Sequence, residues 1–336
     1  MSFKTKVFIV IDFIIICCFV FVYGPWDYAK NFWICTAMET GSHRYLANMF
    51  YSQKVIDDVM SQNYLEEINE DTDTSSITVG QIETVGDYVD GYDKEILEHE
   101  EGQDFKYITF KYGDFDVHLI AIYDPTKVNA AYNNPLYKGR ILSDISKEVN
   151  AQCAINGGGY SWSNSKPAGL VVHDGKVVYA SSSGYNEAAA LTWDGKLIYG
   201  SFRPADIESK NIKEALTFWP ALIVNGKAVS MKGNGGSGQN PRTVIAQRKD
   251  GVILFLVVNG YGSRLSYRGR GGVYYSDLIT ILQRYKAYTA INMDGGSSST
   301  MVINHKLVND PCEPQREGQD FIRSAWYLAP KAEGNE

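Results

Sequence analysis

Four short turns restrict the fold of this chain more than any other feature of its sequence. They read HDGK from His173, WDGK from Trp193, VNGK from Val224 and KDGV from Lys249. In each turn, Asp-Gly or Asn-Gly lies between two apolar runs, and these residue pairs tolerate the positive φ angles that a two-residue hairpin turn requires. We therefore expect several antiparallel hairpins in the later part of the chain.

Two segments repeat the order of helix, buried strand and glycine-rich loop. Apolar residues spaced by three and four predict one helix in ILSDISKEV, from Ile141, and another in SDLITILQRYK, where Ser276 is the expected N-cap. Short apolar runs follow, AQCAI at 151–155 and AYTAINM at 287–293, and we expect both to be buried strands. Helix–strand units together with hairpins predict an α+β domain over 105–330, with a mixed or antiparallel sheet and a few helices.

The N-terminal segment predicts a membrane helix. Lys4 and Lys6 precede an apolar run of about 17 residues, which is near the lower limit for a helix that crosses a bilayer. No small-residue cleavage site follows, so an uncleaved signal-anchor over 1–24 is favoured over a cleaved signal peptide. Basic residues before the span place the N-terminus inside and the remaining chain outside the cell. We thus expect a single-pass cell-membrane protein whose main domain is extracellular.

Two segments separate this predicted anchor from the main domain. Residues 25–60 show helical spacing of apolar residues and predict a juxtamembrane helical segment. Residues 61–104 carry a local charge of about −13, whereas the whole chain carries −7. The polar, unpatterned run NEDTDTSSIT lies in this part, so we expect an acidic spacer that is flexible or partly ordered.

Three loops are candidates for a functional site. The loop NGGGYSW begins at Asn156, and its backbone N–H groups form either an anion-binding nest or a tight turn closed by the Asn side chain. The loop DGGSSST begins at Asp294, its one charged residue, and matches neither a P-loop nor a dinucleotide-binding fingerprint. The third loop, GNGGSGQNPRT, ends with Arg242 at the entry to a strand, where arginine suits either a phosphate or a salt bridge.

Other classes of site and partner fit the sequence less well. The chain has five cysteines but no C-x-x-C pair, so we expect no structural zinc site; pairing of Cys153 with Cys312 is left open. Arg264, Arg268 and Arg270 form a basic segment, but the chain is acidic overall, so we expect no nucleic-acid partner.

Three motifs, in order, resemble those of the phosphodiester glycosidase family. They read AINGGGYS, NPRTVIAQRKDGVILFLVVNGY and AINMDGGSSSTMVINHKLVN, and the resemblance covers about Phe105 to Pro330. The segment TAMETGSHRYLANMFYS is similar to that of membrane-anchored bacterial members labelled as exopolysaccharide biosynthesis proteins. The resemblance implies that the three motifs gather around one pocket. It also implies an enzyme that hydrolyses the bond between the anomeric carbon of a sugar and a phosphodiester oxygen.

The resemblance also implies which residues form the site. Asn259-Gly260 stands where the family commonly has Asp-Gly, so a carboxylate is not expected to act there. The expected catalytic residues are Asp294, Arg242 and Asn156, and the expected substrate-binding residues are Gly157, Gly158, Thr243, Gly295, Gly296, Ser297, Ser298 and Arg323.

These residues suggest a division of roles. Arg242, assisted by Arg323 and by the amides of residues 156–158, would neutralise the departing phosphate. Asp294 would attack the anomeric carbon, activate water or stabilise the oxocarbenium-like centre. Thr243 and the serines would orient phosphate or sugar hydroxyl groups. The hypothesis requires no cofactor, although the residues leave open a divalent cation at Asp294.

The expected substrate is a phosphodiester-linked glycan of the cell surface or the extracellular space. Two other functions use the same residues. One is a non-catalytic surface module that binds an anionic polysaccharide. The other is a glycosyl-transferring enzyme of exopolysaccharide assembly, in which a sugar replaces water as the acceptor.

Overall fold

The computed structural model describes residues 3–39, 44–66, 68, 70–80, 88–161, 163–182, 187–261, 271–313 and 316–331. The chain divides into two units: unit 1 is Met1–Glu66 with Ser230–Gly238, and unit 2 is Glu67–Val229 with Gln239–Glu336. The basic residues Arg264, Arg268 and Arg270 lie outside the described residues.

Unit 1 is mostly helical. Helices α2, α3 and α4 form over the segment predicted to be helical, and Ile34, Ala47 and Ile56 are buried together between them. The side chain of Ser52 accepts a hydrogen bond from Val55 N and so caps α4. The elements are α1 (Phe3–Tyr23), α2 (Asp27–Glu39), α3 (Arg44–Phe50), α4 (Gln53–Met60) and the antiparallel pair β1 (Tyr64–Leu65) and β13 (Met231–Lys232).

The predicted membrane helix over residues 1–24 is not supported. Helix α1 forms over most of this range, but within the described residues no helix is long and apolar enough to cross a bilayer. Lys4, Lys6 and Asp12 lie among the 21 residues of α1, whereas a spanning helix needs about 20 predominantly apolar residues in succession. The predicted contact with a membrane through this helix therefore lacks support as well.

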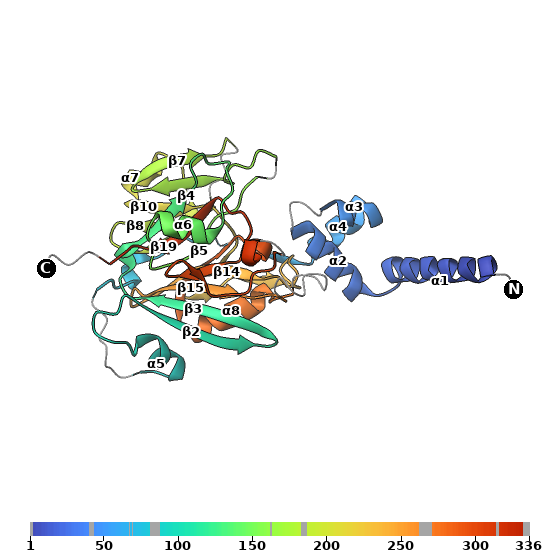
Figure 1. Ribbon diagram of the computed structural model, residues 1–336, viewed down its shortest axis with the longest axis horizontal. Helices are drawn as coiled ribbons and strands as arrows, with labels where there is room; N and C mark the ends of the chain where they lie inside the picture. Colours follow the sequence, from blue (N-terminus) through green and yellow to red (C-terminus); the bar gives the residue numbers. More distant parts are fainter. Residues whose placement is uncertain are drawn as a thin grey trace. The chain divides into compact units, whose positions relative to one another are not determined.

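Unit 2 contains three antiparallel sheets, which confirms the predicted α+β class (Figure 1). The seven-stranded sheet has the order β12 (Lys227–Ala228), β11 (Ala221–Val224), β16 (Ala287–Met293), β14 (Arg242–Arg248), β15 (Ile253–Val258), β3 (Phe115–Ile122) and β2 (Phe105–Tyr112). One five-stranded sheet has the order β18 (Lys306–Leu307), β17 (Met301–Ile303), β5 (Cys153–Asn156), β19 (Ser324–Leu328) and β4 (Val128–Tyr132). The other has the order β7 (Lys176–Ala180), β6 (Leu170–His173), β10 (Ile212–Leu216), β8 (Glu187–Thr192) and β9 (Leu197–Ser201).

All four predicted hairpin turns are present. They connect β6 with β7, β8 with β9, β11 with β12 and β14 with β15. In the first of them, Asp174 and Gly175 have φ angles of 48° and 69°, as a type I′ turn requires. The Asp-Gly and Asn-Gly pairs therefore determine where these strands reverse.

The helices of unit 2 are short. Helix α6 packs on β5, β17 and β19, and α8 packs on β11 and β16. The N-cap of α8 is Tyr274 rather than the expected Ser276, because Asp277 Oδ2 accepts a hydrogen bond from Tyr274 N at 2.9 Å. The elements are α5 (Gly91–Leu97), α6 (Leu142–Glu148), α7 (Asp206–Ser209), α8 (Tyr275–Arg284) and the 3₁₀ turns η1 (Thr74–Ser76), η2 (Pro125–Lys127), η4 (Gly296–Ser298) and η5 (Arg316–Gly318).

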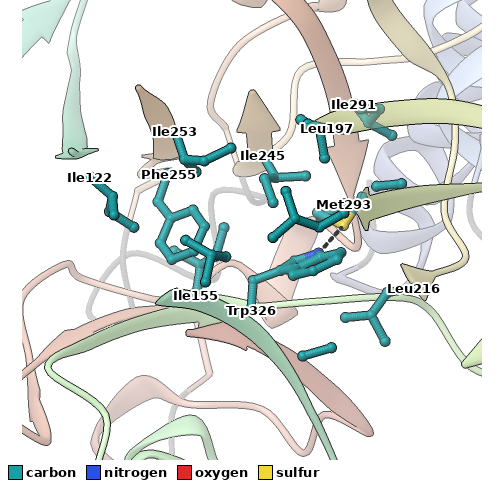
Figure 2. Packing of buried hydrophobic residues seen from close by; sticks show 14 of the residues in the cluster. Ile122, Ile155, Leu197, Leu216, Ile245, Ile253, Phe255, Ile291, Met293 and Trp326 are labelled. Carbon is teal, nitrogen blue, oxygen red and sulfur yellow. Dashed lines mark hydrogen bonds between the residues drawn. The ribbon is translucent and has the colours of Figure 1, made fainter. Parts of the chain in front are cut away.

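The main core lies where side chains of the three sheets meet. Figure 2 shows Trp326 of β19 pointing toward Met293 of β16, and its indole Nε1 donates to Met293 Sδ at 3.3 Å. Ile291 and Ile245 face the same cluster, so the alternate residues of β16 and β14 point to the opposite face. Cys153 also belongs to this core, and both it and Cys312 are free thiols, so no disulfide joins them.

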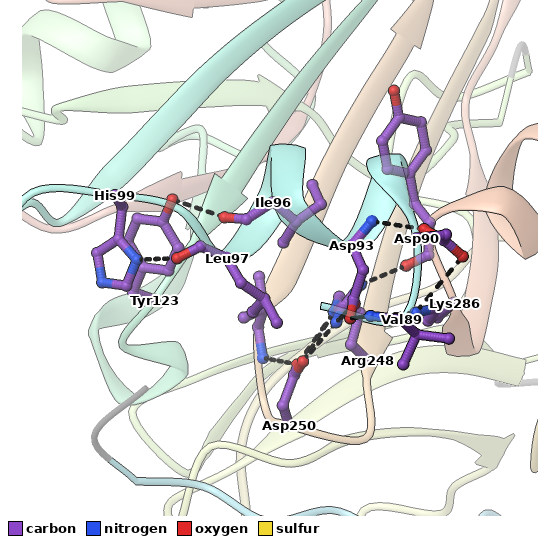
Figure 3. Close-up of polar contacts among 12 residues, drawn as sticks. Val89, Asp90, Asp93, Ile96, Leu97, His99, Tyr123, Arg248, Asp250 and Lys286 are labelled. Atoms are coloured by element: carbon purple, nitrogen blue, oxygen red, sulfur yellow. Dashed lines mark hydrogen bonds and ion pairs between the residues drawn. The ribbon is translucent and has the colours of Figure 1, made fainter. Parts of the chain in front are cut away.

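Part of the predicted acidic spacer is built into unit 2. Helix α5 buries Ile96 and places Asp93 Oδ1 at 2.7 Å from Arg248 Nη2 (Figure 3). Burial alone would raise the pKa of Asp93, but hydrogen bonds from Arg248 and the Val89 amide lower it overall. Helix α5 is therefore held by an ion pair between Asp93 and Arg248, which lies 155 residues later in the chain. The local composition of the acidic segment does not reveal this pair.

Candidate active site

The three motifs meet at the start of β14 and the end of β16, two neighbouring inner strands of the seven-stranded sheet. Asn156 is the last residue of β5, Asp294 follows β16, and Thr243 lies at the start of β14. Thr243 Oγ1 donates to Asn156 Oδ1 at 2.8 Å, and Asn156 Nδ2 donates to the backbone oxygen of Asp294 at 2.6 Å. The backbone N–H of Asp294 in turn donates to Gly157 O at 3.1 Å. Segments far apart in the sequence are thereby held in one place.

Cross-strand register decides which side chains share a face here. Strands β14 and β16 pair Thr243 with Met293 at this end of their register, and Arg242 and Asp294 are the next residues along the two segments. Side chains directly opposite in an antiparallel pair point to the same face, with Cβ atoms about 5 Å apart. Thr243 therefore shares the core face with Met293, whereas Arg242, one residue earlier on β14, points to the opposite face, and Asp294 follows the end of β16 directly.

Arg242 is held against the start of α8. Its guanidinium carbon lies 4.2 Å from the centre of the Tyr275 ring, and its Nε donates to Val273 O at 3.3 Å. The residue is only 2% exposed, whereas Asp294 is half-buried. A positive charge with so little water around it stabilises negative charge more strongly than an exposed one does. Of the two side chains, that of Asp294 is the more accessible to a substrate.

The glycines of the Asn-Gly-Gly loop allow close packing. A Cβ atom on Gly157 would lie 2.5 Å from Leu216 Cδ1, and one on Gly158 would lie 2.6 Å from Thr217 O. The N–H of Gly157 donates to Ser324 O at 2.9 Å, and that of Gly158 donates to Ser324 Oγ at 3.0 Å. The expectation that these amides bind phosphate is therefore not supported, because β19 already uses them.

The Asp-Gly-Gly-Ser loop is tied to its neighbours at several points. Gly296, at a φ of 64°, donates its N–H to Pro241 O at 2.9 Å. A Cβ on Gly295 would also meet Pro241 O, at 3.0 Å, so both glycines permit this approach. Ser297 Oγ donates to Asp320 Oδ2 at 2.9 Å, and Ser298 is buried. These two serines thus have places within the fold rather than in an open pocket.

Arg323 lies on the other side of the Asn-Gly-Gly loop. Strands β19 and β5 pair Ala325 with Asn156, and Arg323 directly precedes β19. Its guanidinium lies 4.1 Å from the centre of the Tyr160 ring, and its Nε donates to Ser165 O at 2.9 Å. The structure therefore brings Arg323 to the first motif, whereas Arg242 lies beside the third.

Comparison with known proteins identifies the family. A model of the phosphodiester glycosidase family matches residues 149–325, which are more than half of the 336 residues of the chain. The chain belongs to the phosphodiester glycosidase family.

Individual relatives of this family are distant. The mouse protein N-acetylglucosamine-1-phosphodiester alpha-N-acetylglucosaminidase is 22% identical over 189 residues, which are 51% of this chain and 35% of the mouse protein. The SPbeta prophage-derived uncharacterized protein YomE of Bacillus subtilis (strain 168) is 29% identical over 213 residues, which are 60% of this chain and 30% of that protein. The chain thus spans about a third of the length of these curated relatives.

A solved structure shares the fold. It is the zebrafish N-acetylglucosamine-1-phosphodiester alpha-N-acetylglucosaminidase catalytic domain auto-inhibited by pro-peptide. The two chains superpose with a TM-score of 0.57 at 19% identity, over 69% of this chain and 86% of the zebrafish chain. At this identity the likeness is one of fold.

Asn259, where the family commonly has Asp, belongs to a buried network that sequence reasoning missed. Asn259 Nδ2 lies 3.1 Å from His118 Nε2, and Tyr107 Oη lies 2.6 Å from His118 Nδ1. Asn259 Oδ1 accepts from Asn309 Nδ2 at 3.1 Å, and Asn309 Nδ2 also donates to Ser299 O. Because Asn259 Oδ1 faces a donor, its Nδ2 donates to His118, which keeps the ring neutral. Burial lowers the pKa of His118, in agreement with this assignment.

Trp219 is a second residue that sequence reasoning missed. It is 53% exposed, which is high for such a large aromatic side chain. Its backbone oxygen accepts from Asn292 Nδ2 at 3.1 Å, and Asn292 is two residues before Asp294. On the other side, Phe218 lies against Gly159 of the first motif. No motif contains Trp219, so only the folded chain shows that it lies between the first and third motifs.

Proposed function

We propose that this chain hydrolyses the bond between C1 of a sugar and a phosphodiester oxygen. The observation that carries the proposal is that Arg242 and Asp294 directly follow the last cross-strand pair of β14 and β16, Thr243 and Met293, where the family's three motifs meet. This arrangement supplies one carboxylate and one guanidinium at the ends of two neighbouring strands. Membership of the phosphodiester glycosidase family supports the same reaction class.

The chemistry of the leaving group explains why one carboxylate suffices. Ordinary glycosidases use two carboxylates, one of which protonates a poor leaving group. A phosphodiester releases a phosphate monoester, which is a weak base and needs charge neutralisation more than a proton. We assign Arg242 to the phosphate and Asp294 to the sugar carbon or its attacking water. Water supplies the new oxygen at C1 and a proton for the departing phosphate, and the proposal requires no cofactor.

The remaining site residues act as supports in this proposal. Asn156 and Thr243 hold the backbone of the loop that carries Asp294, and they do so from the core side. Gly157 and Gly158 have no side chain that would clash with Leu216 and Thr217. Arg323 donates to Ser165 O and so holds the segment that follows the first motif. Asn156 is thus assigned a positioning role, in contrast to the catalytic role expected from the sequence.

The substrate class follows from the names of the relatives. N-acetylglucosamine is the sugar in the names of the mouse and zebrafish proteins, so it is the first sugar to test. We propose phosphodiester-linked glycans of the cell surface or the extracellular space as its source. This location and a role in exopolysaccharide assembly stay predictions from the sequence.

The proposal is tested with a small diester. N-acetylglucosamine joined through an α-1-phosphate to a methyl group is incubated with the full chain and followed by NMR. We expect equal amounts of free sugar and methyl phosphate to appear. Binding of the diester without release would indicate a binding module instead. A new sugar–sugar bond in the presence of acceptor sugars would indicate transfer. Either result would contradict hydrolysis.

Trp219 is expected to bind the sugar ring of this diester. Stacking of a ring on an exposed indole contributes about 1 kcal/mol, so Trp219→Ala should raise KM about 5- to 10-fold with little change in kcat, and Trp219→Phe should restore most of the loss. Steady-state kinetics on the methyl diester measure the effect. Trp193, which is 51% exposed in the β8–β9 turn, provides the matched control. An equal effect of Trp193→Ala would contradict a specific role for Trp219.

A further inference from the structure

Three side chains with metal-ligating groups meet on the five-stranded sheet that contains β6 and β10. The register pairs Ala215 with Val172, which places Glu214 directly opposite His173. His173 Nδ1 lies 3.0 Å from Glu214 Oε2, and His173 Nε2 lies 3.6 Å from Asp174 Oδ2. One ligand atom from each residue lies within 4.8 Å of the others. The cluster joins two strands. His173 and Glu214 are 41 positions apart in the sequence, so no short spacing motif predicts it.

The burial of Glu214 makes the cluster unusual. Its side chain is 0% exposed, and among the described residues His173 is its one cationic partner within ion-pair distance. The ammonium group of the adjacent Lys213 is instead bound by Thr126 O at 2.8 Å and Val128 O at 3.3 Å. The backbone amides of Asp174 and Ala130 also donate to Glu214, so the burial of its charge is only partly compensated by hydrogen bonds. A cation between the three side chains would remove this cost.

We propose that His173, Asp174 and Glu214 bind a divalent transition-metal cation such as Zn²⁺. Imidazole nitrogen and carboxylate oxygen are ligands that this ion prefers, at about 2.0–2.2 Å, and two such ligands in a tetrahedral site are roughly 3.4 Å apart. With one ligand atom taken from each residue, the atoms lie within 4.8 Å of one another, so a small movement of side chains brings them to this spacing. Asp174 lies in a hairpin turn with a 60% exposed side chain, so it can rotate toward the ion. Water completes the coordination from the solvent side.

The proposed ion has a structural role. It would tie the β6–β7 turn to β10, which continues into Leu216 and Thr217. These two residues pack against Gly157 and Gly158 of the first motif. The cluster shares no residue with the candidate active site, and the proposal does not depend on the proposed reaction.

The experiment uses the untagged full chain after chelator treatment and dialysis. Zn²⁺ is titrated by calorimetry, and the Tm is measured with and without Zn²⁺. We expect one equivalent to bind and to raise the Tm, since an ion that binds only the folded state stabilises it. His173→Gln should weaken binding at least about 10-fold and abolish the rise in Tm. This residue is preferred over Glu214 because its partly exposed side chain makes misfolding of the variant less of a concern.

A matched control comes from the neighbouring hairpin. Asp194 lies in the β8–β9 turn, whose sequence WDGK parallels HDGK but lacks the histidine. Asp194→Asn should bind Zn²⁺ as the parent chain does, whereas Asp174→Asn should bind it more weakly. The proposal is overturned if the parent chain binds no Zn²⁺, or if His173→Gln binds it as tightly as Asp194→Asn does.

Discussion

Replacement of Asp294 by asparagine is expected to lower kcat/KM for a sugar-1-phosphodiester by about 10³-fold. The reason is that Asp294 is the one charged residue of the third motif's loop and lies where the three motifs meet, so asparagine removes the carboxylate assigned to the sugar carbon or its attacking water. Most of the loss should be in kcat, because the carboxylate acts on charge that develops in the transition state. Kinetics on the methyl diester of N-acetylglucosamine-1-phosphate provide the measurement.

The fold should tolerate this substitution. The loop is held through Asp294 N, which donates to Gly157 O, and through Asp294 O, which accepts from Asn156 Nδ2, and asparagine keeps both backbone groups. The Tm of the variant should therefore stay within a few degrees of the parent. Asp310 is an exposed carboxylate that follows the third motif, and Asp310→Asn should retain full activity. If Asp294→Asn kept more than about a tenth of the parent kcat, its assigned role in the reaction would be wrong.

Local signals predicted much of the fold. The Asp-Gly and Asn-Gly turns predicted four hairpins, because a short turn accepts few residues at positive φ. Both central residues have positive φ in the turns at Asp174 and Asn225, whereas only the glycine has it in the turns at Asp194 and Asp250. Helical spacing predicted α6 and α8, and the apolar run at 287–293 became β16 with the same bounds. The membrane helix was predicted from an apolar run of about 17 residues, and within the described residues no helix is long and apolar enough to cross a bilayer.

Side-chain roles in the site depended on contacts that no local signal contains. The family resemblance placed Asn156 and Arg242 around one pocket. Strand alternation instead puts Arg242 on the α8 face and Asn156 toward the core. The amides of Gly157 and Gly158 are used by Ser324, which is more than 160 residues away. Convergence of the motifs could be expected from the family resemblance. The register of β14 against β16 was needed to separate the residues assigned to the substrate from those that support the loop.

Replacement of Asn156 by alanine is expected to lower both stability and activity. It removes the acceptor for Thr243 Oγ1 and for Thr300 N, and the donor to Asp294 O. Thr243 and Thr300 are buried and Asp294 is half-buried, so loss of these partners should lower the free energy of unfolding by about 2–4 kcal/mol. Because the Asp294 backbone loses its anchor, kcat of the folded protein should also fall, by about 10²-fold. Urea unfolding and kinetics well below the Tm measure the two effects separately.

Gln247 separates a positioning role of Asn156 from simple loss of stability. It lies at the opposite end of β14 and is also a buried amide with three hydrogen bonds, from Leu197 N at 2.6 Å and to Gly195 O and Gly251 O at 2.7 and 3.0 Å. Gln247→Ala should therefore lose a similar free energy of unfolding but keep its kcat. If both variants lost activity in proportion to stability, Asn156 would be a structural residue only. If Asn156→Ala alone lost kcat, the amide would be shown to hold Asp294 in its working position.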